Sequence, residues 1–296
     1  MLSNLSDSSL KNLKEYVYNY KANFRDSLCL SDFIQFGCEV EFNSDLKTNF
    51  YRQIVDKKYT VKKDLSGKDI VEIITPIMYN TVSDWSSFRD MISNLPSAKI
   101  MSDTGGHIHF DHSIINDENI LYFLKFWYVF EDIIYDFSSG EFDNIRPSHF
   151  MFAQKLKDIV NFIDLIETGY IPLNNLDFYG KKYGLNLSNH FNNKNINKDT
   201  YEIRVPNSSL DINIWQNNVE FFASLLLFAN NNKNHDYINE LYKDKVISDT
   251  FENRLLLADL IYNCEESKIR FLNQFTLDRK YEPCQIKKNI LSLGIR

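Results

Sequence analysis

Residues Ile34–Phe42 read IQFGCEVEF, and their pattern predicts a β-strand. Apolar side chains occupy every second position, and the positions between them hold a glutamine, a glycine and two glutamates. A repeat of two residues is typical of a β-strand that has one buried face and one polar face. We therefore predict a strand in which Cys38 faces the core while Glu39 and Glu41 project together from the other face.

More strands and several helices are expected around this stretch. Further strands are predicted within residues 46–75, at Ile108–Phe110 and at residues 200–205. A turn at Ser66-Gly67 is expected to interrupt the strands of residues 46–75. Apolar residues with helical spacing predict helices at residues 10–24, 83–95, 117–137, 150–168, 211–229, 236–246 and 249–262, with Ser83 and Asp211 as N-caps. The asparagine-rich segments 186–198 and 230–234 are expected to be loops. This succession predicts an α+β fold.

Composition and charge exclude several classes of protein. The chain has 296 residues, of which 44% are hydrophobic and 15% aromatic, so it can build a core and is not a disordered chain. Its 33 basic and 40 acidic residues give a formal net charge of -7, which argues against a nucleic-acid partner. A local pocket for an anionic ligand is compatible with this charge.

The cysteines and the apolar runs favour a cytoplasmic protein. The four cysteines are scattered and form no CxxC pair, which favours a reducing compartment over a disulfide framework. Residues 1–11 lack the features of a signal peptide. The most apolar runs, Ile120–Phe137 and Val219–Ala229, contain charges or are too short to span a bilayer, so no membrane partner is expected.

Two acidic motifs offer ligands for a cation. Glu39 and Glu41 share one strand face, and neighbouring carboxylates repel one another unless a cation or a proton lies between them. Hard divalent cations such as Mg²⁺ prefer such oxygen ligands. Glu72 is the single acid in the β-branched run Val71–Thr75, where an unpaired buried charge is costly. Taken singly, each motif is also typical of a solvated strand face or an exposed edge.

Two histidines mark another strand. In Thr104–His112, which reads TGGHIHFDH, the side chains of His107, His109 and Asp111 share one face. Two imidazoles at this spacing are typical of a metal or phosphate site, although structural histidines show the same pattern. The two glycines before them allow another group to approach the backbone closely.

Glu202 and Arg204 form a similar pair on the strand at residues 200–205. Such a pair is typical of a surface ion pair, but arginine is also the best bidentate ligand for phosphate. If the four strands join one antiparallel sheet, their polar faces make a concave site that suits divalent cations and nucleotide phosphates. The sequence contains neither a P-loop nor a GxGxxG motif, so a nucleotide would be held by the sheet.

In their order, these motifs resemble the putative amidoligase family of the glutamine synthetase and glutamate–cysteine ligase superfamily. The resemblance spans about residues 34–229 and rests on the following motifs: GxExE at residues 37–41, DxS at 64–66, EIITP at 72–76, GxHxHxD at 105–111, LNL at 185–187 and ExR at 202–204. The chain departs from the pattern at Asn207–Leu210, where a Gly-Thr-like turn is expected.

The resemblance implies a fold, an activity and roles for all of these motifs except DxS at residues 64–66. The fold would be a curved antiparallel sheet that forms a funnel, with helices outside it. The activity would be ATP-dependent formation of an amide or peptide bond through an acyl phosphate, with Mg²⁺ or Mn²⁺ as the metal. The substrates would be a carboxylate and an amine, either small molecules or peptides, with a protein substrate left open. The implied metal ligands are Glu39, Glu41, Glu72, His107 and Glu202, the implied catalytic and phosphate-contacting residues are His109 and Arg204, and the implied further ligand contacts are Asn186 and Arg146.

The same reading divides the chain into three parts. Residues 1–30 would be an N-terminal helical segment, residues 31–232 the amidoligase-like catalytic domain, and residues 233–296 a helical C-terminal extension that packs on it.

Two other functions compete with this one. The string His107–His112 has the HxHxDH pattern of metallo-β-lactamase-like zinc hydrolases, with His190 and Asp211 downstream. The zinc-hydrolase hypothesis gives no role to Glu39 and the other glutamates on the strands. The other competitor is a non-catalytic binding protein that keeps the fold.

Overall fold

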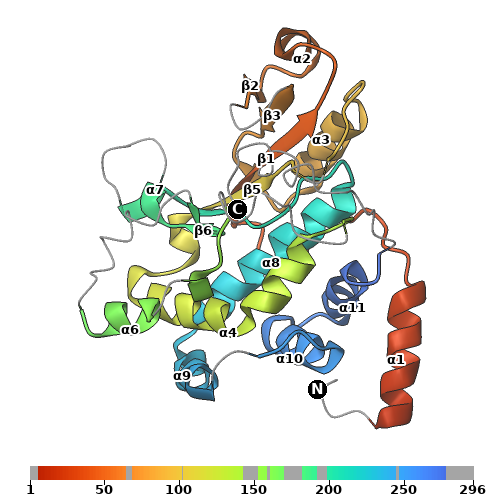
Figure 1. Ribbon diagram of the computed structural model, residues 1–296. Coiled ribbons are helices and arrows are strands. Elements are labelled where there is room, and N and C mark those ends of the chain that lie inside the picture. Colours follow the sequence, from red (N-terminus) through yellow and green to blue (C-terminus); the bar gives the residue numbers. More distant parts are fainter. Residues whose placement is uncertain are drawn as a thin grey trace, which may run out of the picture.

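The computed structural model describes residues 6–64, 69–101, 103–142, 153–158, 161–169, 182–191, 199–244 and 247–277. Their strands form one sheet in the order β2-β3-β1-β5-β7-β6, with β4 paired to β1, and all of these pairings are antiparallel (Figure 1). The strands are β1 (Gln35–Asn43), β2 (Thr60–Lys63), β3 (Ile70–Ile74), β4 (Met78–Tyr79), β5 (Gly106–Asp111), β6 (Leu185–Asn186) and β7 (Thr200–Ile203).

Helices flank this sheet and follow it at the C-terminal end of the described chain (Figure 1). The α-helices are α1 (Asp7–Asn19), α2 (Thr48–Ile54), α3 (Val82–Ser93), α4 (Ile120–Ser138), α6 (Phe162–Glu167), α7 (Ser188–Phe191), α8 (Ile212–Asn230), α9 (His235–Asp244), α10 (Phe251–Ile261) and α11 (Glu265–Gln274). Short 3-10 helices are η2 (His112–Ile114), η3 (Asp117–Asn119), η4 (Leu156–Asp158) and η6 (Asn232–Asn234). The predicted α+β class with an antiparallel sheet and C-terminal helices is confirmed.

The apolar face of β1 packs against helices, as its repeat of two residues predicts. The ring of Phe36 lies 5.2 Å from that of Trp85 on α3, measured between centroids. At the other end of the strand, Phe42 meets Tyr51 of α2 edge to face at 5.1 Å. Because Cys38 lies between these two contacts and is fully buried, the core side of β1 is fixed along its whole length.

Helices α4 and α8 are the main helices of the core. Most of their residues are buried, which is typical of helices surrounded by other elements. Aromatic pairs join them, with Phe126 stacked on Phe228 at 4.7 Å and Trp127 on Phe222 at 5.8 Å. At the start of α8, the side chain of Asp211 accepts a hydrogen bond from the backbone N–H of Asn213 at 2.8 Å, so the predicted cap is confirmed.

The N-terminal helix and the last described helices pack against each other (Figure 1). The side-chain amide of Asn273 on α11 donates to the backbone oxygens of Val17 and Tyr20, which closes the end of α1. Arg25 continues this contact with a buried ion pair to Glu220 of α8 at 2.6 Å. The division at residues 30 and 232 stays a prediction.

Several predicted elements differ from the structure. Residues 48–54 form helix α2 rather than a strand. Helix α3 begins after Thr81, whose hydroxyl accepts from the N–H of Asp84, so Ser83 is not its cap. Asn186 lies in the short strand β6 rather than in a loop, and α11 was not expected at all. Within the described residues, no helix has the length and apolar character needed to cross a membrane.

Gly106 tests how tightly the sheet packs on α8. A Cβ atom at this position would lie 2.9 Å from the ring of Trp215 and 3.1 Å from the backbone oxygen of Asn207. We predict that Gly106→Ala lowers the free energy of unfolding by about 1–3 kcal/mol, because the added methyl group overpacks the interface. Gly37→Ala on the neighbouring strand is the control, since its Cβ would meet only ordinary contacts, the nearest at 3.6 Å. Equal melting temperatures for the two variants would contradict this prediction.

Candidate active site on the polar face of the sheet

The sheet register gathers the predicted site residues on one face. Glu39 lies opposite His107 of β5, and Glu41 lies opposite Glu72 of β3. Farther along the sheet, His109 is paired with Glu202 of β7. In turn, Glu202 is paired with Asn186 of β6. Five strands that are separated in sequence therefore supply side chains to one continuous polar surface, which we call the carboxylate face.

The carboxylate of Glu39 lies at the centre of this face. One of its oxygens is 3.0 Å from His107 Nδ1, and the other is 3.1 Å from His109 Nε2. Burial acts to raise the pKa of Glu39, but the hydrogen bonds with the two imidazoles outweigh burial and hold the pKa far below its usual range. Glu39 is therefore an anion at any pH at which the protein is expected to work.

Glu202 is the second buried carboxylate, and it is 4% exposed. It forms an ion pair with Arg204, and the amide of Asn186 donates to its Oε2 at 2.7 Å. Its Oε1 also lies 3.6 Å from His107 Nδ1. Burial acts to raise the pKa of Glu202, but Arg204, His107 and His109 together outweigh burial and lower the pKa. The face thus holds a second permanent anion beside the histidines.

Glu41 and Glu72 extend the face toward β3. Glu41 Oε2 accepts a hydrogen bond of 2.6 Å from the backbone N–H of Gly105. Burial, followed by repulsion from Glu39, raises the pKa of Glu72 to about 7, although the nearby Lys62 acts in the opposite direction. Because a proton is retained there near neutral pH, a cation at this end of the face would exchange with a proton.

The donor set of the carboxylate face fits a divalent cation. Ligand atoms of Glu39, His109 and Glu202 lie within 4.8 Å of one another. Two of these three donors are carboxylate oxygens, and Glu41 and Glu72 place two more carboxylates beside them. Oxygen-rich sites of this kind suit Mg²⁺ or Mn²⁺, and a bound cation would offset the repulsion between the carboxylates.

Other predicted residues lie elsewhere. The side chain of Asp111 accepts from the N–H of Ser113 and caps η2 at the end of β5. Cys38 faces the core, and burial raises the pKa of its thiol well above the usual value, so it is no nucleophile at neutral pH. Arg146 and Ser66 lie outside the described residues.

Two residues of the face were missed by reasoning from sequence. Lys62 lies opposite Glu72 in the register and brings a positive charge to the edge of the face. Thr200 places its hydroxyl 3.2 Å from His109 Nδ1, so both nitrogens of that ring have a partner. A signal for Lys62 was present in the sequence. Val61 is buried and Thr60 and Lys62 on either side of it are exposed, so Lys62 lies on the polar face of β2.

The HxHxDH string does not assemble as a zinc hydrolase requires. The side chains of His107 and His109 contact Glu39 on the carboxylate face, whereas His112 begins η2 and faces Asp199 instead. Asp211, the expected downstream ligand, caps helix α8. The turn after Asp111 therefore divides the string between two separate places.

One comparison, with models of protein families, agrees with the motifs. A family model described as "Putative amidoligase enzyme" matches residues 5–226. Among solved structures, the chain is similar to a bifunctional glutathione synthetase from Pasteurella multocida, with 12% identity and a TM-score of 0.46. That match covers 98% of this chain and 52% of the synthetase, so the chain spans about half the length of that protein. No curated protein matches the sequence.

The proton at Glu72 predicts a pH dependence for cation binding. The pKa of this carboxyl is raised to about 7, so below that pH an incoming cation must displace a proton. We expect the affinity for Mg²⁺ to rise with pH and to level off above about pH 7. Calorimetric titration in buffers of different ionisation enthalpy measures the released proton directly. The Glu72→Gln variant should bind Mg²⁺ more weakly, and its affinity should vary less with pH. An unchanged pH profile would contradict the role given to the Glu72 proton.

Proposed function

The chain belongs to the putative amidoligase family, and we propose that it forms an amide or peptide bond in an ATP-dependent reaction. The observation that carries the proposal is the buried carboxylate face, on which Glu39 and Glu202 stay anionic beside two imidazoles and Arg204. Such a set suits a metal–nucleotide complex, because cations and arginine together neutralise phosphate charge. The substrates are a carboxylate and an amine, carried by small molecules or peptides, and a protein substrate fits the same chemistry.

The reaction runs in two balanced steps. A carboxylate oxygen of the substrate forms a bond to the γ-phosphorus of ATP while the bond from that phosphorus to the ADP oxygen breaks. The product is an acyl phosphate, in which the carboxyl carbon has a good leaving group. The nitrogen of the amine then bonds to that carbon, inorganic phosphate leaves, and the nitrogen loses a proton to yield the neutral amide.

The glutamates and histidines of the carboxylate face are proposed to hold Mg²⁺, which Mn²⁺ can replace. The proposed ligand set is Glu39, Glu41, Glu72, His107 and Glu202, and His109 can join it because its ring lies within reach of Glu39 and Glu202. When bound, the metal supplies charge neutralisation for the phosphate groups. The protein contributes by burying these groups, which strengthens each electrostatic interaction relative to water.

Arg204 and His109 are proposed to contact the phosphate groups. The ion pair with Glu202 orients the guanidinium of Arg204, so less side-chain freedom is lost when it binds an anion. His109 is held by Glu39 and Thr200, which fixes the plane of its ring. Both groups are thus arranged before the substrate arrives, as electrostatic stabilisation of a transition state requires.

Asn186 is proposed to support Glu202. Its amide donates to Glu202, while its carbonyl oxygen accepts from the backbone N–H and the hydroxyl of Ser188. Both ends of this fully buried side chain are therefore engaged within the protein. Through these bonds Asn186 orients the carboxylate, and a direct contact with the nucleotide would require one of them to break.

Phosphate release tests the proposal. The chain is incubated with ATP, Mg²⁺ and pools of amino acids, peptides and polyamines, and sustained release of ADP and phosphate is expected only when a carboxylate and an amine are both present. Sustained turnover of ATP without an amine, or hydrolysis that needs tightly bound zinc, would contradict the ligase function. If the chain neither binds ATP nor turns it over with any of these substrate pools, a non-catalytic binding protein that keeps the fold is favoured instead.

Arg204 gives the sharpest variant. We predict that Arg204→Lys lowers kcat by roughly 100-fold or more, because lysine cannot form the bidentate contact with the transferring phosphoryl group. The control is Arg89→Lys on α3, a half-buried arginine that pairs with its neighbour Asp90. Both variants should keep the wild-type melting temperature within a few degrees. Equal loss of activity in the two variants would contradict the role of Arg204.

A further inference from the structure

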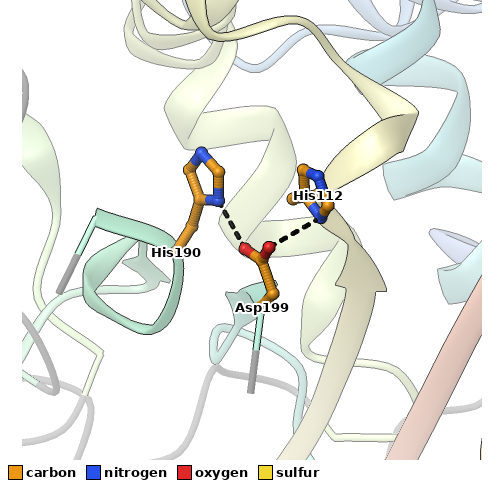
Figure 2. A group of neighbouring side chains, drawn as sticks. All are labelled: His112, His190 and Asp199. Carbon is orange, nitrogen blue, oxygen red and sulfur yellow. Dashed lines mark hydrogen bonds and ion pairs between the residues drawn. The ribbon is translucent and has the colours of Figure 1, made fainter. Parts of the chain in front are cut away.

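A second cluster of imidazole and carboxylate groups lies where β5 ends and β7 begins. It contains His112 of η2, His190 of α7 and Asp199, the residue before β7. One possible ligand atom from each lies within 4.8 Å of the other two. Figure 2 shows the carboxylate of Asp199 between the two imidazoles, with one oxygen directed toward each ring.

Both histidines turn their Nδ1 atom toward the carboxylate of Asp199. His190 Nδ1 is 2.5 Å from Asp199 Oδ1, and His112 Nδ1 is 3.1 Å from Asp199 Oδ2. The two rings are stacked, with centroids 5.1 Å apart and planes inclined by 12°. His112 Nδ1 is buried and makes no hydrogen bond with the described residues, although Asp199 Oδ2 lies 3.1 Å and Asp111 Oδ1 lies 3.8 Å from it. This nitrogen is therefore available to a ligand.

The far side of His190 is held as in a metal site. Its Nε2 lies 2.7 Å from Asp117 Oδ1, and that oxygen also accepts a hydrogen bond of 3.3 Å from the hydroxyl of Tyr201. Histidines that bind metals usually donate their other ring N–H to a carboxylate, which fixes the tautomer and the ring plane. With the proton on Nε2, the lone pair of Nδ1 faces Asp199 and His112.

This cluster is separate from the carboxylate face. Thr200 contacts His109 on that face, whereas the next residue, Tyr201, places its ring 5.2 Å from the ring of His190. Successive residues of a strand point to opposite sides of the sheet. His190 and its partner Asp117 therefore lie on the side opposite Glu202 and His109.

We propose that His112, His190 and Asp199 form a zinc site. Two imidazoles and one carboxylate are typical zinc ligands, with bonds of about 2.0–2.2 Å and a tetrahedral arrangement. Ligand atoms in such a site are roughly 3.3 Å apart, so the contact between His190 and Asp199 must open slightly. Three protein ligands leave one position for water or a small anion. The metal would join η2, α7 and the start of β7, and this proposal does not depend on the ligase function.

Zinc binding to the metal-free full-length chain tests the proposal. The titration uses competition with a chromogenic chelator, in a Glu39→Gln/His109→Gln background that disables the carboxylate face. One equivalent of zinc should bind, and His112→Ala or His190→Ala should weaken it by roughly 100-fold or more, since each removes a ligand. Asp117→Asn should weaken it by about 10–100-fold, the usual effect of losing a partner of a ligating histidine.

A histidine outside the cluster supplies the control. His235, the first residue of α9, stacks its ring on that of Tyr122 in α4 and is not part of the cluster. The substitution His235→Ala should therefore leave zinc affinity unchanged. In the same Glu39→Gln/His109→Gln background, zinc should raise the melting temperature, and Asp199→Asn should abolish that rise while preserving the shape of the side chain. Zinc affinity that is insensitive to both histidine variants, or absence of binding to a folded chain, overturns the proposal and leaves a cluster of ion pairs.

Discussion

The carboxylate of Glu39 between the imidazoles of His107 and His109 is the interaction on which the site depends. It joins the two central strands of the sheet, β1 and β5, through side chains as well as through the backbone. A slip of one residue in this register would move Glu39 to the core face and Cys38 to the polar face. The burial of charge and the packing of the core are therefore fixed by the same strand alignment.

The acidic character of the chain takes on a local meaning in this arrangement. The formal net charge of -7 argues against a nucleic-acid surface, yet several of the acids converge on one face. Hydrogen bonds and Arg204 keep Glu39 and Glu202 ionised despite burial, whereas Glu72 retains a proton up to a pH of about 7. Cations bound there would reverse the local sign of charge, so an acidic protein can still bind a phosphate ligand.

One histidine-rich string contributes to two places because the strand ends within it. Up to Asp111 the chain alternates, so His107 and His109 share the carboxylate face. Asp111 then caps η2, and the turn directs His112 toward His190 and Asp199. A motif read as one metal site thus becomes parts of two clusters. Gly106, at the start of the same strand, leaves room for the ring of Trp215 and the backbone of Asn207.

Sequence alone determined the two faces of β1, the buried helices α4 and α8, and the side chains that share the polar face of each strand. These features follow from periodicity, which the local backbone geometry of strands and helices dictates. Sequence did not predict that Lys62 lies beside Glu72, that Asn186 bonds to Glu202, or that His112 stacks on His190, and these neighbours are seen in the three-dimensional structure alone. Such neighbours depend on strand order and on turns between distant segments, because pairing energy comes from contacts that no short stretch of sequence contains.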